Sequence, residues 1–319
     1  MGKFKVVVTD YVFPNLEPEK KILGDIAEVV DCKDASDDAL KAELKDAEGV
    51  LNCYRKFPRP FIEATTKCKG IVRYGIGVDT IDIPAATEKK IIVCNVPDYC
   101  IDEVSDQAMT MILACARKLV VSDQLVKSGN WSLAPLKPVY RLRGRTLGLF
   151  GFGKIPRMVA EKAKPFGFNI ITCDPYITDE FAAKYGVRRV DFDTLLRESD
   201  IISIHAPLTD ETRGIFNAQA FAKMKQGAIL VNTARGPLVN EVDLAKALAD
   251  GKIAAAGLDV LSSEPPAPDN PILKAPNVIL APHAAWYSEE ALVDLQRKAA
   301  EEMRRILLGE KPNSQVNKF

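Results

Sequence analysis

Residues 147–174 read LGLFGFGKIPRMVAEKAKPFGFNIITCD, and this stretch decides the fold of the chain. An apolar run, a pair of glycines, a helical pattern and a second apolar run follow one another and end at an acid. This order predicts a strand, a tight turn, a helix and a second strand. The parts are the strand at residues 147–150, Gly151 and Gly153 in the turn, the helix at residues 155–166, and the strand at residues 169–173 with Asp174 after it.

The glycines and the acid point to a bound dinucleotide. Gly151 allows a turn that a side chain would obstruct, and Gly153 lets the backbone approach a pyrophosphate. The start of the helix, at Lys154 and Ile155, offers N–H groups and the positive end of its dipole to phosphates. Asp174 lies 21 residues after Gly153, near the ~20 expected for a carboxylate that bonds a ribose 2′-hydroxyl. Because such a carboxylate repels a 2′-phosphate, the sequence favours NAD over NADP.

Residue 156, where the motif has its third glycine, is Pro156. A proline in the first helical turn loses no needed hydrogen bond, because the N–H groups there have no partner within the helix. We therefore expect the helix to form with slightly altered packing. Two glycines alone also fit an ordinary strand–turn–helix, but the strand, the helix and the acid in register favour the dinucleotide.

The composition excludes several classes of protein. The chain has 319 residues, enough for two domains, and its 43 basic residues equal its 43 acidic ones, which gives no electrostatic case for nucleic acid or an anionic membrane. No apolar run is long enough to span a bilayer, and the first residues lack the core of a signal peptide. The seven cysteines show no C-x-x-C spacing, which indicates buried thiols in a reducing cytoplasm. Neither of the two histidines lies beside a cysteine pair, so no metal site is expected.

Short apolar strands alternate with helical patterns along the chain, which predicts an α/β protein with parallel sheets. We expect two Rossmann-like doubly wound parallel-sheet domains with an active-site cleft between them. Residues 1–101 would form the first part of a substrate-binding domain and residues 102–289 an NAD-binding domain. Residues 290–319 would return to the substrate-binding domain with a C-terminal helix.

Two long helices frame the nucleotide-binding domain in this interpretation, at residues 104–127 and 288–308, and residues 312–319 look loose. The other expected strands are residues 5–9, 28–31, 49–52, 69–74, 91–95, 200–205, 228–232, 253–259 and 278–280. The other expected helices are residues 18–26, 36–45, 60–67, 192–197, 218–225 and 241–249.

Two loops of the first domain are candidates for ligand binding, because function in such sheets gathers at the carboxyl ends of the strands. Residues 52–55 follow the third strand, and residues 74–79 follow the fourth. Gly75 and Gly77 in the second loop expose backbone N–H groups that could bind a small carboxylate. A plain turn fits this loop equally well.

Hydride transfer beside a nicotinamide needs a group that exchanges a proton, and histidine suits this exchange near neutral pH. The chain offers His205, at the end of the strand IISIH, and His283, after the strand VIL. We prefer His283, because it lies beside the second crossing between the domains and hence in the expected cleft. For a single histidine at such a place, a hydrogen-bonded structural role is the plainer alternative.

The histidine acid needs partners. A carboxylate must orient it and stabilise its charged form, and Glu264, in the loop after IAAAGLDV, is a good candidate. A 2-oxo acid needs a fixed cation, and Arg235, directly after another strand, offers a planar fork that suits a carboxylate. A solvated loop acid and a surface ion pair are the alternatives for these two residues.

Four motifs resemble the D-isomer-specific 2-hydroxyacid dehydrogenases. They are GFGKIP at residues 151–156, NTARGPLVNE at 232–241, GLDVLSSEP at 257–265 and APHAAW at 281–286. The resemblance covers nearly the whole chain and implies two Rossmann-like domains, with the substrate domain made from both chain ends. It also implies an NAD-dependent enzyme that forms homodimers through its nucleotide domains.

The resemblance assigns roles to individual residues. Arg235 would bind the substrate's carboxylate and carbonyl, Glu264 would pair with the histidine, and His283 would be the acid and base. The predicted cofactor contacts are Gly151, Gly153, Lys154, Ile155, Asp174, His205, Ala206, Pro207, Thr212, Thr233 and Asp259. The predicted substrate contacts are Tyr54, Arg55, Tyr74, Gly75, Ile76 and Trp286.

Within the family, three segments look most like the C-terminal-binding-protein branch and its glycerate dehydrogenase-like relatives. They are VRYGIGVDTIDIPAA at residues 72–86, CNVPDYC at 94–100 and HAAWYSEEA at 283–291. The best substrate prediction is hydroxypyruvate or glyoxylate, reduced to D-glycerate or glycolate.

Two alternatives remain open. In a D-3-phosphoglycerate dehydrogenase the arginine for the phosphate would fall at Asn52, although Arg55 is near enough to substitute, and a chain ending at 319 has no room for an added regulatory domain. This alternative ranks second. The co-repressor branch uses the same fold as an NAD-sensing scaffold that binds peptides, and it keeps the same catalytic set.

Overall fold

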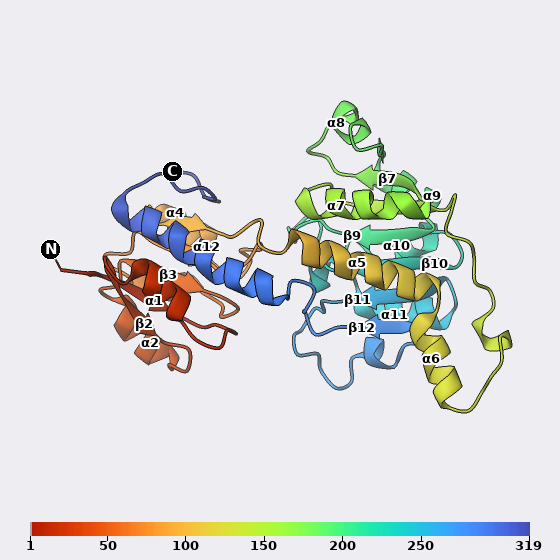
Figure 1. The fold of residues 1–319 in the computed structure, drawn as a ribbon, viewed down its shortest axis with the longest axis horizontal. Coiled ribbons are helices and arrows are strands. Elements are labelled where there is room, and N and C mark those ends of the chain that lie inside the picture. The colour runs from red at the N-terminus through yellow and green to blue at the C-terminus, as the bar shows by residue number, and fades with distance from the viewer. Residues whose placement is uncertain (1) are drawn as a thin grey trace. The chain divides into compact units, whose positions relative to one another are not determined.

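The computed structural model describes residues 2–319, which form two compact units (Figure 1). The first unit runs to Cys100 and resumes from Tyr287 to Phe319, and the second unit is Ile101–Trp286. Each unit contains one parallel sheet, as the strand–helix alternation predicts. The prediction of two parallel-sheet α/β domains is therefore confirmed.

The first unit has a five-stranded sheet with the order β2-β1-β3-β4-β5. Gly49 and Gly70, in the third and fourth strands, lie under the C-terminal helix, and a side chain at either position would collide with Met303 or Ile306 of that helix. These glycines let the helix pack closely on the sheet. The strands are β1 (Phe4–Val8), β2 (Ala27–Asp31), β3 (Gly49–Asn52), β4 (Gly70–Arg73) and β5 (Ile92–Cys94). The helices are α1 (Glu17–Leu23), α2 (Asp37–Leu44), α3 (Arg59–Ala64), α4 (Ile83–Glu88) and α12 (Glu289–Leu308).

The second unit has a seven-stranded sheet with the order β12-β11-β10-β9-β6-β7-β8. From β6 the chain first builds one side of the sheet and then returns to the other side at β9, so the switch point lies between β6 and β9. The strands are β6 (Thr146–Phe150), β7 (Asn169–Cys173), β8 (Arg188–Arg189), β9 (Ile201–Ile204), β10 (Ala228–Asn232), β11 (Ile253–Leu258) and β12 (Val278–Leu280). The helices are α5 (Ile101–Ala116), α6 (Leu119–Lys127), α7 (Lys154–Ala163), α8 (Asp179–Ala183), α9 (Phe192–Glu198), α10 (Ala218–Lys223) and α11 (Glu241–Ala249).

The single helix predicted at residues 104–127 is wrong in one respect, because the structure has two helices there. The helices α5 and α6 meet at Lys118, whose backbone is left-handed with φ of 52°. Neither glycine nor proline marks this break, so the sequence pattern runs through it. Figure 1 shows α6 leaving the line of α5.

The prediction that residues 312–319 are loose is also wrong. Gln315 bridges Cys94 in an antiparallel sense, and the N–H of Val316 donates to the carbonyl of Val93 at 2.8 Å. The side chain of Asn317 accepts from the N–H of Val93 at 2.9 Å and donates to the carbonyl of Ile91. The tail therefore covers the exposed edge of β5.

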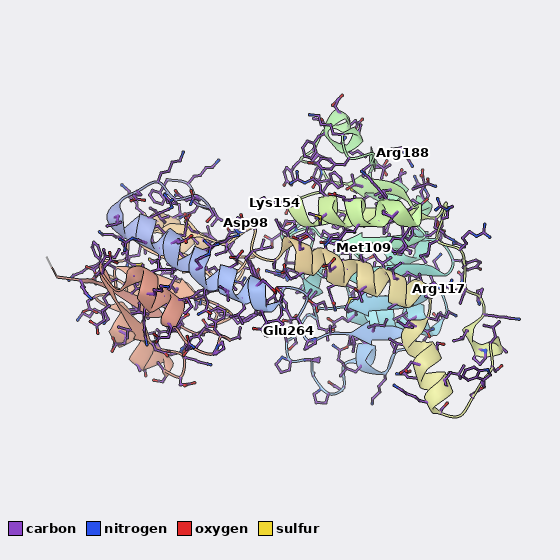
Figure 2. All side chains as sticks on the ribbon, in the orientation of Figure 1. Asp98, Met109, Arg117, Lys154, Arg188 and Glu264 are labelled. Carbon is purple, nitrogen blue, oxygen red and sulfur yellow. The ribbon has the colours of Figure 1, made fainter. Side chains whose placement is uncertain are left out.

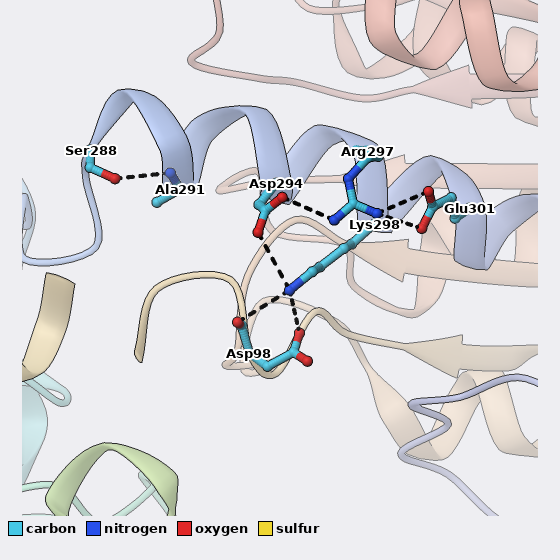
Figure 3. A network of polar contacts seen from close by, with 7 residues as sticks. All are labelled: Asp98, Ser288, Ala291, Asp294, Arg297, Lys298 and Glu301. Atoms are coloured by element: carbon cyan, nitrogen blue, oxygen red, sulfur yellow. Dashed lines mark hydrogen bonds and ion pairs between the residues drawn. The ribbon is translucent and has the colours of Figure 1, made fainter. Parts of the chain in front are cut away.

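Helix α12 is tied to the loop after β5 by a polar network (Figure 3). Lys298 Nζ lies 3.0 Å from the carboxylate of Asp98 and 3.7 Å from Asp294, which also pairs with Arg297. Ser288 caps the helix by accepting from the N–H of Ala291. Among residues 2–319, no helix is both long and apolar enough to cross a membrane.

Candidate active site

Glu264 and His283 form a pair in the second unit. Nδ1 of His283, after β12, lies 2.7 Å from Oε2 of Glu264, and Oε1 of Glu264 accepts from the N–H of Leu261 at 3.1 Å. Burial, the largest single influence, acts to raise the pKa of Glu264, but the bond to His283, the charges of His283 and Arg235 and the N–H of Leu261 together lower it. The ionised carboxylate directs the Nδ1 proton toward itself, which makes Nε2 the atom that can exchange a proton with a substrate.

The backbone of His283 is left-handed, with φ of 53°, and Asp259 holds it there. The N–H of His283 donates to the carbonyl of Asp259 at 2.7 Å, and the N–H groups of Ala284 and Ala285 each donate to its carboxylate at 3.0 Å. Asp259 is only 1% exposed, and burial raises its pKa. Sequence reasoning predicted Asp259 as a cofactor contact and missed that it also shapes the histidine loop.

His205 lies at the end of β9, with Nε2 2.8 Å from the hydroxyl of Ser203. Burial lowers the pKa of His205 to about 3. Its imidazole is therefore neutral near pH 7 and cannot act there as a charged proton donor. Of the two histidines, His283 alone is suited to general acid chemistry.

Arg235 follows β10, and its guanidinium donates to the carbonyl of Ala234 at 2.8 Å. Asn232 fixes this turn, because its amide group donates to the carbonyl of Arg235 at 2.8 Å and accepts from Ala234 at 3.0 Å. A side chain at Gly236 would collide with the backbone of Leu261, so the turn lies directly against the loop that carries Glu264. The positive charge of Arg235 helps to lower the pKa of Glu264. The structure thus brings Arg235, Glu264 and His283 to the carboxyl ends of three adjacent strands.

The glycine turn after β6 has the geometry that the sequence predicts. Gly151 has φ of 94°, and a side chain there would approach the N of Ala206 at 3.0 Å. Gly153 is the N-cap of α7, whose first residue is Lys154 (Figure 2). The carboxylate of Asp174 accepts from the N–H of Phe152 at 2.7 Å, so the acid also fixes the turn. Pro156 lies in the first turn of α7, where proline is tolerated.

Two observations fit a dinucleotide at this edge of the sheet. Among the described residues, the hydroxyl of Thr233 is the buried side-chain atom without a hydrogen-bond partner, which is costly unless a ligand supplies one. The N–H groups of Gly153, Lys154 and Ile155 likewise donate to no atom of residues 2–319. Thr212 is placed to shape the neighbouring loop, since its hydroxyl donates to the carbonyl of Pro207 at 2.8 Å.

Asp174 has a basic neighbour that sequence reasoning missed. The guanidinium of Arg189 donates to the carbonyl of Asp174 at 3.1 Å and pairs with Asp179 at 3.1 Å. Because this arginine already has a carboxylate partner, its charge is partly compensated.

A second cluster lies in the first unit, at the end of β4. The guanidinium of Arg73 occupies the space that a side chain at Gly75 would fill, and Gly75 has φ of 136°. Arg73 is only 7% exposed, donates to the carbonyl of Cys53 at 3.3 Å and lies over the ring of Tyr54. No carboxylate pairs with it within the described chain. The N–H groups of Gly75, Ile76 and residue 77 also lack acceptors among residues 2–319, so this loop is suited to an anion.

Sequence reasoning missed Arg73, although one signal was available. A basic residue at the last position of a strand, directly before a glycine loop, lies where parallel sheets collect functional groups. The arginine was hidden inside an otherwise apolar strand and was counted with it.

The other residues predicted to contact substrate differ in their surroundings. Asp10 accepts from the N–H groups of Cys53, Tyr54 and Arg55, at 3.0, 2.6 and 2.8 Å, and so fixes their loop. Arg55 pairs with Asp37 at 2.7 Å and lies over the ring of Phe61. The side chain of Tyr74 is buried in the core of the first unit, which leaves only its backbone for a ligand. Trp286 is the last residue of the second unit.

Comparison with known proteins identifies the family. A family model described as the NAD binding domain of D-isomer specific 2-hydroxyacid dehydrogenases matches residues 109–285. The chain is 42% identical over 315 residues to a D-3-phosphoglycerate dehydrogenase of Methanocaldococcus jannaschii, covering 98% of this chain and 59% of that relative. It is 39% identical over 303 residues to a glyoxylate reductase of Korarchaeum cryptofilum, covering 94% and 86%. The chain thus spans little more than half of the first relative's length.

A solved structure gives the same answer for the fold. The D-lactate dehydrogenase of Aquifex aeolicus, in complex with NAD and lactic acid, superposes with a TM-score of 0.87 at 28% identity over 96% of both chains. The match extends over both units of the chain. The protein belongs to the D-isomer-specific 2-hydroxyacid dehydrogenase family and carries its NAD-binding domain.

Proposed function

We propose that the protein is an NAD-dependent D-2-hydroxyacid dehydrogenase that reduces a small 2-oxo acid, with His283 as its acid and base. The observation that carries this proposal is the 2.7 Å contact of His283 with an ionised Glu264, beside Arg235. The other histidine, His205, stays neutral because burial lowers its pKa to about 3. One histidine of the chain is therefore equipped to exchange a proton during the reaction.

Each residue of the site has its own role in the proposed reaction. NAD, when bound, accepts or supplies the hydride at C2 of the acid. Arg235 binds the carboxylate through its planar fork and polarises the carbonyl. His283 donates a proton from Nε2 to the oxygen as the alcohol forms, and Glu264 stabilises the imidazolium before the transfer. Gly75, Ile76 and Arg73 are proposed to bind the same acid through their donor groups.

We propose an unphosphorylated substrate, hydroxypyruvate or glyoxylate. This is supported by Arg55, whose charge is paired with Asp37, and by Asn52, which is fully buried and donates to the carbonyl of Arg55. Neither side chain is poised for a phosphate. The 39% identity to a glyoxylate reductase is in keeping with this choice.

The second candidate is a D-3-phosphoglycerate dehydrogenase. It is favoured by the 42% identity to a relative of that name and by Arg73, a buried cation that pairs with no carboxylate in the described chain. Substrate preference separates the two candidates.

We also propose that the protein is a cytoplasmic homodimer formed through its second unit. Large apolar side chains are exposed along α6 and the segment that follows it, and Trp131 is 89% exposed. Such a patch is typical of an interface. The other exposed apolar side chains of this segment are Leu119, Val126, Leu133 and Tyr140. Sedimentation that gave a monomer would contradict the dimer.

The cytoplasmic location is supported by the cysteines, because all seven are free thiols, as suits a reducing compartment.

The test is NADH oxidation with hydroxypyruvate, glyoxylate, pyruvate, phenylpyruvate and 3-phosphohydroxypyruvate, using the wild type and His283→Ala. Fast turnover of hydroxypyruvate or glyoxylate by the wild type supports the first candidate, and preference for the phosphorylated compound supports the second. His283→Ala should bind NADH normally and lose turnover by about a hundredfold or more. Normal turnover by this variant would exclude His283 as the acid. If the wild type binds NADH but reduces none of the five acids, a peptide-binding scaffold of the co-repressor type becomes the better proposal.

A further inference from the structure

A carboxylate is buried in the first unit, far along the sequence from the catalytic set. Glu19, on α1, is 0% exposed. The hydroxyl of Tyr74 donates to its Oε1 at 2.8 Å, and the amide of Gln296, on α12, donates to its two oxygens at 3.1 and 3.0 Å. The same amide donates to the carbonyl of Asn15 at 2.9 Å. Three segments distant in the sequence thus meet at one carboxylate.

This cluster is costly to the fold. No basic side chain compensates Glu19 within residues 2–319, and burial raises its pKa. Burial also raises the pKa of Tyr74 well above its usual value. Apolar side chains of similar volume would avoid the desolvation of these groups. The cluster therefore needs a reason beyond packing.

The residue that the cluster fixes begins the loop with the anion-binding N–H groups. Tyr74 lies between Arg73 and Gly75, and its own N–H donates to the carbonyl of Asn52 at 2.7 Å. Its ring packs edge-on against Phe13, with centroids 4.9 Å apart. With its hydroxyl on Glu19 as well, Tyr74 is held at its backbone, its ring and the tip of its side chain.

The first residues of the loop after Tyr74 are fixed through their carbonyl groups. The carbonyl of Gly75 accepts from Val96 at 2.9 Å, and the carbonyl of Ile76 accepts from the side chain of Asn95 at 2.7 Å. Its N–H groups remain for a ligand. Small shifts of Tyr74 would therefore move these N–H groups directly, and a displacement of about 1 Å is enough to weaken a directed contact.

We propose that Glu19 and Gln296 are positioning residues for substrate binding, which act by anchoring the hydroxyl of Tyr74 and so hold the N–H groups of Gly75 and Ile76 toward the substrate's carboxylate. This rests on the proposed function for its ligand, a 2-oxo acid. It adds two residues from outside the loop, one on α1 and one on α12, to the machinery that recognises the acid.

The experiment compares Tyr74→Phe and Glu19→Gln with the wild type in two measurements. Hydrogen exchange of peptides covering residues 74–79 is measured without ligand, and KM and kcat are measured with the preferred 2-oxo acid. Tyr74→Phe should speed exchange of the loop and raise KM about tenfold, since one hydrogen bond to a charged group is worth about that factor. The value of kcat should stay within about twofold, because the reacting groups are untouched.

A matched control is Tyr11→Phe. The hydroxyl of Tyr11 donates to the carboxylate of Asp31 at 2.7 Å in the same unit, so the substitution deletes the same kind of bond at the surface. It should change neither KM nor exchange of residues 74–79. A melting temperature for each variant detects loss of stability. The double variant Tyr74→Phe with Glu19→Gln should raise KM no more than the worse single variant, because Tyr74→Phe removes the same bond that Glu19→Gln weakens.

The outcomes separate this proposal from the proposed function. If Tyr74→Phe only lowers the melting temperature and leaves KM and exchange unchanged, the cluster is a structural core and the proposal is overturned. Additive increases in KM in the double variant would also overturn it. If the wild type reduces none of the acids, the proposed function fails. Hydrogen exchange then still tests the anchoring of Tyr74 by Glu19, because unchanged exchange of residues 74–79 in Tyr74→Phe would overturn it.

Discussion

Oε2 of Glu264 and Nδ1 of His283 lie 2.7 Å apart, although the two residues follow different strands, β11 and β12. Both belong to the second unit, so the pair is assembled by one sheet and its loops. The carboxylate has a further anchor in the N–H of Leu261 at 3.1 Å. Orientation of the imidazole is thus built into the fold before any substrate binds.

Replacement of this carboxylate tests what it does for the acid. In Glu264→Gln the imidazolium loses the charge that stabilises it, so reduction should slow by at least about tenfold. Stopped-flow measurement of hydride transfer from NADH checks this. An unchanged rate would show that the carboxylate has no part in the reaction.

The same variant has a consequence for stability, whose sign follows from the lowered pKa of Glu264. Burial alone would raise that pKa from its usual 4.5, but the bond to His283, together with the N–H of Leu261 and the nearby positive charges, lowers it overall. The ionised group thus stabilises the fold fully above pH 4.5, and this contribution is lost as pH falls through the lowered value. Wild type and Glu264→Gln should differ in urea midpoint near neutral pH and converge in acid. Curves that stay parallel into acid would contradict this account.

Asp259 is predicted to matter for catalysis through the backbone of His283. Asp259→Asn keeps one acceptor but turns an amide NH2 toward an N–H of Ala284 or Ala285, so the loop must shift. Since His283 is held in a left-handed conformation, the shift should displace its imidazole and lower kcat by about tenfold or more. Steady-state kinetics with saturating NADH measure this.

Asp200→Asn is the matched control for that variant. Asp200 accepts from the N–H of Thr146 at 2.8 Å and pairs with Arg145 at 2.8 Å, and it precedes β9 at the amino end of the same sheet. It should lower the melting temperature without lowering kcat. If the two variants lose activity equally, the effect of Asp259 is general destabilisation.

The sequence predicted those features that local chemistry dictates. The spacing of Gly151, Gly153 and Asp174 depends on backbone sterics and on a helix N-terminus. Both glycines lie in the predicted turn, and Asp174 follows β7 and accepts from the N–H of Phe152 in that turn. Arg235, Glu264 and His283 each follow a strand, and parallel strands bring such positions together. For these residues the pattern of strands in the sequence is nearly sufficient to predict their positions in the fold.

Features that depend on tertiary contacts escaped the sequence. Lys118 adopts a left-handed backbone within an unbroken helical pattern, and Asn317 anchors a polar tail through bonds to Val93 and Ile91 that no local rule specifies. Tyr74 is aromatic and lies beside a ligand loop, which favoured a contact with substrate. Its side chain instead points to a buried carboxylate 55 positions away in the chain.

The close approach of Arg73 to Gly75 supports a final prediction. In Gly75→Ala the new methyl group would fall on the guanidinium of Arg73, and the residue would also keep a backbone with φ of 136°. Displacement of the arginine should raise KM for the 2-oxo acid by about tenfold or more, because a charged hydrogen-bonding group is lost from the anion-binding loop.

Gly227→Ala is the control, since Gly227 has φ of 75° with nothing within 4 Å of the added carbon. It should cost about 1 kcal/mol in stability from backbone strain and leave KM unchanged. Kinetics and urea unfolding of both variants separate the two effects. If both lose stability and only Gly75→Ala loses affinity for the acid, the close approach of Arg73 to this loop is needed for binding. If their KM values are equal, Arg73 has no part in binding the acid.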